Sequence, residues 1–168
     1  MEKLLGFHWR RIIMGFVFLL VFPVAACAAA KNDQESDQPA LCVDAQSSET
    51  PESKPFIVRS RFVKVDISLL VDEEGRPRDL QPGTKILLNL FPDTTYVGLI
   101  SQIEENGPAS YSWIGSLENV EFGEMLIVLS DGIFIAHVAS PGGVYEVQFA
   151  GEDLYQIVEI DQSKLPQD

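Results

Sequence analysis

Histidine, cysteine and serine are the residues through which this chain could carry out covalent or metal chemistry. His137 is the only histidine beyond residue 26. A Ser-His-Asp triad would have to use it, and no G-x-S-x-G turn is present to hold a nucleophilic serine. The sequence also lacks an H-E-x-x-H and a C-x-x-C motif, so the usual zinc ligands are missing. We therefore expect no catalytic residue, no metal and no cofactor, and we predict that the chain is not an enzyme.

His137 is expected on a strand, on the same face as Ile133 and Ile135. We interpret it as a histidine of the core or its rim. The acidic residues gather at predicted turns and strand ends, and none of their groups matches the D-x-[DN]-x-[DN]-G loop of an EF-hand. We interpret them as solvated loop charge rather than as calcium ligands or a carboxylate pair.

Three aromatic residues are candidates for contact with a ligand or a partner. Tyr111, Trp113 and Tyr145 lie in segments that are expected to be strands. Exposed aromatic side chains could line a groove for a small ligand or a glycan. Aromatic residues on strands also serve as core or cross-strand partners, so both interpretations stay open.

Cys27 is the one residue to which the sequence assigns a specific chemical fate. A basic start that includes Arg10 and Arg11 leads into an uncharged apolar segment, residues 12–26. Its length suits a secretory signal better than a spanning helix, which needs about 20 apolar residues. Residues 24–27, Val-Ala-Ala-Cys, resemble the lipobox of bacterial lipoproteins, which implies lipid attachment at Cys27. Cleavage near residue 30 with release of a soluble protein, or a retained helix, are the alternatives. All three place the remainder outside the inner membrane.

The chain beyond this leader is strongly acidic. The whole sequence has 12 basic and 25 acidic residues, of which residues 1–26 hold three and one, leaving 9 against 24 and a net charge of −15. Such a charge disfavours binding to nucleic acid. Residues 27–54 are mostly polar, charged or proline, and we expect a disordered tether there that contains Cys42.

Residues 55–168 are expected to form one domain of the all-β class. Residues 62–69 alternate between apolar and polar side chains, as a strand with one wet face does. Residues 125–130 and 133–139 flank Asp131-Gly132, a dipeptide typical of type I′ hairpin turns. Short β-branched and aromatic runs recur between turn residues along the whole segment. We predict an antiparallel, meander-rich sandwich or barrel of about seven to eight strands.

The order of several short segments resembles the N-terminal pro-region of secreted bacterial zinc metalloproteases of the reprolysin-like and peptidyl-Asp metalloendopeptidase type. The segments are residues 59–66, 87–93, 111–115, 117–118, 131–132, 141–145 and 159–163. The resemblance covers nearly all of residues 55–166, and it brings no zinc ligand with it. It implies a non-catalytic interaction module, tethered in the bacterial envelope, that assists the folding of a partner zinc metalloprotease or inhibits it. The alternative is a surface or periplasmic lipoprotein that binds a small ligand or glycan through its aromatic patch.

Overall fold

The computed structural model describes residues 38–47, 50–51 and 54–166. The leader and Cys27 lie outside the described residues. Within that part of the chain, no helix is long and apolar enough to cross a membrane.

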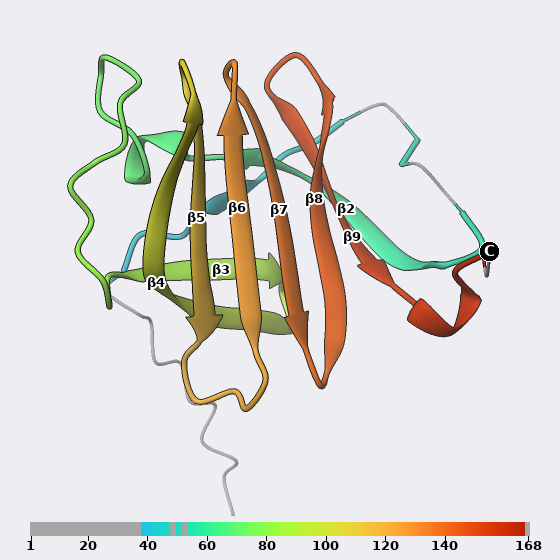
Figure 1. The fold of residues 1–168 in the computed structure, drawn as a ribbon. Coiled ribbons are helices and arrows are strands. Elements are labelled where there is room, and N and C mark those ends of the chain that lie inside the picture. The colour runs from blue at the N-terminus through green and yellow to red at the C-terminus, as the bar shows by residue number, and fades with distance from the viewer. Residues whose placement is uncertain (1–37, 48–49, 52–53, 167–168) are drawn as a thin grey trace, which may run out of the picture. The chain divides into compact units, whose positions relative to one another are not determined.

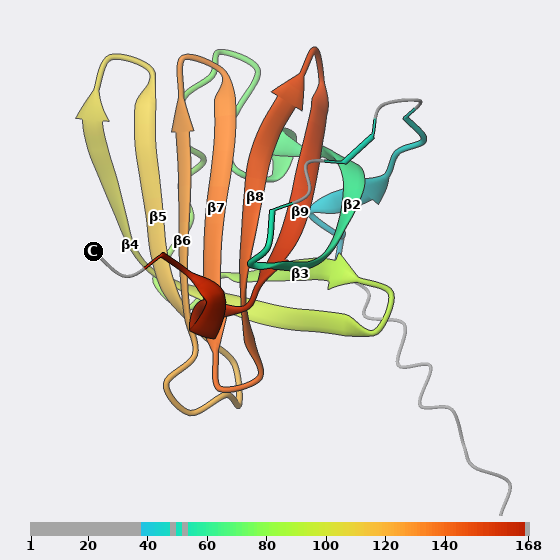
Figure 2. The ribbon, with the colours of Figure 1, turned by 90° about the vertical axis from the view of Figure 1, so that its right-hand side faces the viewer.

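Nine antiparallel strands form one sheet that curves into a nearly closed barrel (Figure 1). Their order in the sheet is β1-β2-β9-β8-β7-β6-β5-β4-β3, so β3 to β9 follow one another as a meander, and β2 pairs with β9 at its far side. Strands β5 to β8 form the front of the barrel, and β2 and β3 cross behind it (Figures 1 and 2). The predicted all-β class is confirmed, in its barrel form. The strands are β1 (Cys42–Asp44), β2 (Ile57–Val65), β3 (Lys85–Phe91), β4 (Thr94–Gly107), β5 (Ser110–Leu117), β6 (Glu124–Ser130), β7 (Ile133–Ser140), β8 (Gly143–Gly151) and β9 (Leu154–Ile160).

Alternation along the strands places one set of side chains inside the barrel. Trp113 of β5, Ile127 of β6 and Phe134 of β7 are all fully buried, and they belong to one continuous hydrophobic core. Burial of each such side chain stabilises the fold by about 2 kcal/mol relative to an exposed one. The barrel is therefore filled by its own side chains.

Tight turns join the consecutive strands. Between β6 and β7, Asp131 and Gly132 both have positive φ, 51° and 79°, as a type I′ turn requires. The hairpin predicted at this dipeptide is confirmed. The strand predicted over residues 62–69 ends earlier, because the Asp66 carboxylate accepts a hydrogen bond from the backbone N–H of Ser68 at 3.1 Å. This local bond starts a short 3-10 helix, η1 (Ile67–Leu69), in place of further pairing. A second 3-10 helix, η2 (Gln162–Lys164), follows β9.

Strand β1 is the main difference between the expected and the observed fold. We expected a disordered tether over residues 27–54, but Cys42–Asp44 pairs with β2, and Leu41 and Cys42 are buried in the core at 1% and 2% exposure. The expectation is wrong for this stretch, because Leu41 and Cys42 are buried and β1 is bonded both to β2 and, through Leu41 and the Asn89 side chain, to β3. Burial also raises the pKa of the Cys42 thiol to about 11, so at neutral pH it is protonated and a poor nucleophile.

The barrel closes where β1 meets β3, and side chains make much of this contact. A backbone hydrogen bond joins Leu41 N–H to Leu87 C=O at 3.0 Å. Next to it the Asn89 side chain pairs with the backbone of Cys42, accepting from its N–H at 2.9 Å and donating to its C=O. The Asn89 amide therefore bonds to β1 as the backbone of a neighbouring strand would.

Two arginines on β2 bond across the same seam. Arg61 donates from Nε to the Leu90 carbonyl at 2.6 Å, and from its Nη atoms to the Asn89 carbonyl and to Asp44. Arg59 lies nearer the end of the barrel, where it bonds to Glu159, Asp93 and Thr94. These bonds tie β2 to β3 and β4, which lie at the opposite end of the strand order.

We predict that Arg61→Met lowers the free energy of unfolding by about 2 to 4 kcal/mol, since it leaves two strand carbonyls and Asp44 without their charged donor. Arg76→Met is the matched control, because Arg76 pairs only with carboxylates of its own surface loop, and such exposed ion pairs add little to stability. Urea denaturation of the purified chain measures both. Equal losses in the two variants would show that the seam does not hold the barrel closed.

Candidate functional site

The outer face of β6 and β7 carries apolar side chains that the core does not use. Positions that alternate with the buried ones place Leu126 and Val128 of β6, and Ile133 and Ile135 of β7, on the outside. Leu126 is 40% exposed and Ile135 is 47% exposed. Because a strand with one wet face normally has polar residues at such positions, this apolar surface is a candidate functional site.

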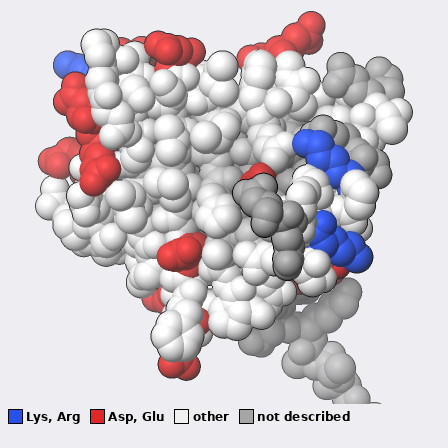
Figure 3. All heavy atoms as spheres, turned by 45° about the vertical axis from the view of Figure 1, so that its right-hand side comes forward, with Lys and Arg blue, Asp and Glu red and all other residues white. Residues whose placement is uncertain are grey.

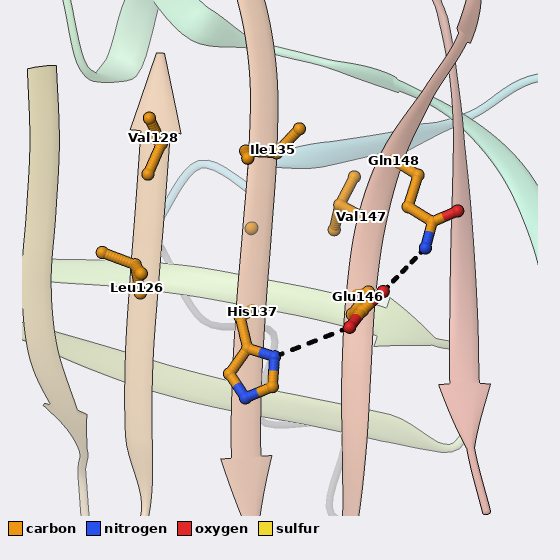
Figure 4. A pocket seen from close by; sticks show the side chains of 8 residues that line it. Leu126, Val128, Ile135, His137, Glu146, Val147 and Gln148 are labelled. Atoms are coloured by element: carbon orange, nitrogen blue, oxygen red, sulfur yellow. Dashed lines mark hydrogen bonds and ion pairs between the residues drawn. The ribbon is translucent and has the colours of Figure 1, made fainter. Parts of the chain in front are cut away.

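Leu126, Val128 and Ile135 border a hollow of about 240 Å³ on the outside of β6, β7 and β8 (Figure 4). Leu126 and Val128 form one wall, and Ile135 rises from the neighbouring strand. Glu146 and Gln148 of β8 line the opposite side. The hollow is thus apolar toward β6 and polar toward β8. We call this surface, made by Leu126, Val128, Ile135, His137, Glu146 and Gln148, the outer hollow.

A chain of polar contacts forms one side of the outer hollow. The strand register sets His137 directly beside Leu126 on one side and Glu146 on the other. His137 Nδ1 lies 3.9 Å from Glu146 Oε1, and Gln148 Nε2 donates to Glu146 Oε2 at 2.7 Å (Figure 4). His137 is half-exposed and faces outward, together with Ile133 and Ile135 as expected, so it is not a core residue.

The outer hollow combines apolar side chains with a few polar groups. No serine, cysteine or threonine is among the residues that line it. Among the described residues, no group of three or more His, Cys, Asp and Glu side chains is placed to hold a metal ion. The lining offers apolar contact area together with one carboxylate, one imidazole and one amide, which suit the binding of a polypeptide segment.

The aromatic residues predicted to contact a ligand lie inside the barrel. Tyr111, Trp113 and Tyr145 are 8%, 0% and 3% exposed, because all three occupy inward positions of their strands. Trp113 packs beside Tyr111 with ring centroids 6.3 Å apart, and its Nε1 has no hydrogen-bond partner among the described residues. Burial raises the pKa of Tyr145 to about 12, and the neighbouring Tyr96 adds to the shift. The prediction of an exposed aromatic platform is therefore wrong for these residues.

Sequence reasoning missed the residues of the outer hollow, although one signal was present. Residues 125–129, Met-Leu-Ile-Val-Leu, are apolar at every position, whereas a strand with one wet face alternates. Such a run in a fold with few layers means either burial on both faces or an apolar outer face. No second layer of the described structure covers β6, so the outward-facing residues of segment 125–129 are exposed.

Charge is distributed unevenly around this face. Figure 3 shows a broad area without charged side chains, with acidic side chains mainly at its left, upper and lower margins and basic side chains at its right. Glu146 is the acidic residue that lines the outer hollow itself.

No protein-family model matches the chain. No curated protein sequence matches it either. Among solved structures, it is similar to a chain from "Structure of a chaperone-substrate complex", with 16% sequence identity and a TM-score of 0.51. The match covers 67% of this chain and 92% of that chain. At this identity the similarity concerns the fold, and it shows that nearly the whole of that chain shares this barrel architecture.

We predict that Ile135→Thr changes the free energy of unfolding by no more than about 0.5 kcal/mol, because the side chain lies outside the core and threonine suits a strand. Phe134→Ala, one residue away on the inner face, should cost about 3 to 5 kcal/mol. Chemical denaturation of both variants gives the comparison. A loss of about 2 kcal/mol or more in Ile135→Thr would mean that the outer hollow serves folding.

Proposed function

We propose that this chain is a non-catalytic module that binds a partner protein through the outer hollow and the apolar surface around it. The observation that carries this proposal is the exposure of Leu126 and Ile135, with the partly buried Val128 lining the same hollow, on a sheet whose inner face already forms the core. Contiguous exposed apolar surface on a soluble domain marks interaction sites. A hollow with apolar walls and a few polar groups can receive one or two side chains of the partner as anchors.

The partner we propose is a zinc metalloprotease, whose folding the module assists or which it keeps inactive. The resemblance of residues 55–166 to the pro-regions of such proteases supports this choice. The similar solved chain belongs to a chaperone–substrate complex, and we extend the idea of a chaperone-type contact from that fold to this one. The buried positions of Tyr111 and Trp113 leave the alternative, a ligand or glycan bound on an aromatic patch, without its residues.

The mode of contact that we propose is binding to the face of the sheet. Addition of a partner strand needs a free strand edge. Here the edges of β1 and β3 face one another, and bonds from Asn89 and Arg61 occupy backbone groups of both β1 and β3. The outer hollow, by contrast, is open along three strands.

The double variant Leu126→Thr/Ile135→Thr should weaken partner binding by at least about tenfold, because it removes apolar anchors while keeping strand-forming residues. The partner is captured from its own membrane fraction by a photo-cross-linker at position 128, and it is tested for zinc-dependent proteolysis. Affinity for the purified protease is then measured for each variant.

Val43→Thr/Val58→Thr is the matched control, since both valines are exposed apolar residues on β1 and β2, away from the outer hollow. It should bind as the unmodified chain does. Absence of any zinc protease among the cross-linked proteins would refute the proposed partner. Equal affinities of the two double variants would refute the proposed site.

We also propose that the module is held outside the cytoplasmic membrane by a lipid on Cys27. Cys27→Ser should move the protein from the membrane fraction to the soluble fraction and remove the mass of the lipid, as fractionation and mass spectrometry can show. Cys42→Ser is the control, because that thiol is buried in the barrel. A Cys27→Ser protein that stays in the membrane with an unchanged modification would contradict the anchor.

A further inference from the structure

The loop between β5 and β6 carries the most exposed large apolar side chain of the described residues. Phe122 is 85% exposed, more than any other such side chain. The loop, residues 118–123, projects beyond the lower end of the barrel (Figures 1 and 2). A single exposed apolar side chain is common on protein surfaces, so the exposure of Phe122 matters only together with its backbone conformation and its surroundings.

The loop is tightly built. Gly123 N–H donates to the Val120 carbonyl at 3.1 Å, and Leu117 N–H donates to the Gly123 carbonyl at 3.1 Å. Val120 packs against the core, and Gly123 is buried so closely that an added Cβ would lie 2.7 Å from the Cβ of Leu117. Glu118 N–H bonds to the Val97 carbonyl of β4 at 2.8 Å, which fastens the loop to the sheet. These contacts fix the direction in which the Phe122 side chain leaves the loop.

The backbone of Phe122 lies in the left-handed region, with φ of 58°. It is the third residue of a four-residue turn closed by the Gly123 to Val120 hydrogen bond, where a positive φ favours glycine or asparagine. A bulky aromatic residue in this region is a genuine outlier. Glycine would relieve the backbone, and the exposed ring gains little from contact with its own chain, so folding does not explain a phenylalanine here.

We propose that Phe122 is an anchor residue that inserts into an apolar pocket of the partner protein, and that Lys or Arg side chains border this pocket. The charge of the loop supports the basic border. Glu121 and Glu124 lie one and two residues from Phe122 in the sequence, and neither takes part in an ion pair with the described residues, whereas Glu118 pairs with Lys85 at 2.5 Å. Two unpaired carboxylates beside an apolar anchor favour a basic surface and disfavour an anionic lipid headgroup.

The same charges disfavour a second copy of this chain as the partner. The outer hollow is lined by Glu146, so docking Phe122 there would bring Glu121 and Glu124 toward a like charge, on a chain that is already strongly acidic. Phe122 instead stands at the end of the strand that carries the outer hollow. Glu124 and Leu126 alternate outward along β6, so one partner can cover both the anchor and the outer hollow. The inference thus rests on the proposed function and adds a residue and a partner chemistry to it.

The test compares three variants of the full chain. For each, we measure the affinity for the zinc protease that the photo-cross-linker at position 128 captures. Phe122→Gly should weaken binding by at least about tenfold while leaving the midpoint of thermal unfolding unchanged or higher, because it removes the ring and relieves the backbone. Phe122→Leu should retain most of the affinity, since leucine still fills an apolar pocket. Glu121→Lys should slow association by reversing a charge at the border of the contact.

A photo-cross-linking phenylalanine analogue at position 122 identifies what the ring touches. Attachment to a protein site with apolar walls and neighbouring Lys or Arg residues supports the inference. Attachment only to lipid, attachment only to another copy of this chain, or no adduct overturns it. Equal affinities of Phe122→Gly and the unmodified chain also overturn it.

The outcomes separate this inference from the proposed function. If Leu126→Thr/Ile135→Thr weakens binding and Phe122→Gly does not, the proposed function stands and the anchor is wrong. If no zinc protease is captured, the proposed partner fails, and the adduct at position 122 alone decides whether Phe122 contacts another protein of the stated chemistry. Membrane binding by the loop is tested separately by co-sedimentation of the Cys27→Ser protein, which has no lipid anchor, with vesicles of anionic lipid. We expect no binding, and binding that Phe122→Gly abolishes would overturn the inference.

Discussion

Closure of the sheet at the seam between β1 and β3 is the constraint on which the rest of this structure depends. A sheet of nine strands has two edges whose backbone groups need partners, and an open edge also exposes the core beside it. Here side chains supply many of those partners. Asn89 bonds to the backbone of Cys42 as a strand would, and Arg61 donates to the carbonyls of Leu90 and Asn89. Because these hydrogen bonds pair backbone groups at both edges of the sheet, the inner face can consist of closely packed apolar side chains.

A filled interior changes the meaning of the apolar residues outside it. In a barrel without an outer layer, Leu126 and Ile135 contribute little to the core, since Ile127 and Phe134 already occupy the inward positions beside them. Phe122 is even harder to explain by folding, because its backbone is left-handed and glycine would be more stable than phenylalanine at that position. Residues that folding does not explain, and that lie along one strand and the loop before it, point to a function carried on the outside of the barrel.

What the sequence could predict depended on the range of the interactions involved. The β6–β7 hairpin follows from Asp131-Gly132 and the runs beside it, so it could be predicted from local residues alone. Strand β1 could not, because its partner Asn89 is 47 residues away and its own surroundings are polar. The direction of Trp113 also depends on distant contacts. Alternation tells which residues share a face, while the curvature of the whole sheet decides which face is inside.

The outer hollow and the Phe122 loop have opposite shapes, and together they restrict the kind of molecule that fits. The outer hollow is concave and needs an apolar side chain presented by its occupant, whereas Phe122 is convex and needs a pocket to receive it. A small ligand could fill the outer hollow but could not cover the ring on the loop. A macromolecule that meets both requirements must have a surface with both a protruding apolar side chain and an apolar pocket. Basic side chains beside that pocket would face Glu121 and Glu124. A folded protein surface provides this combination, which is the physical reason why we propose a protein partner, rather than a metabolite or a glycan, for this face of the barrel.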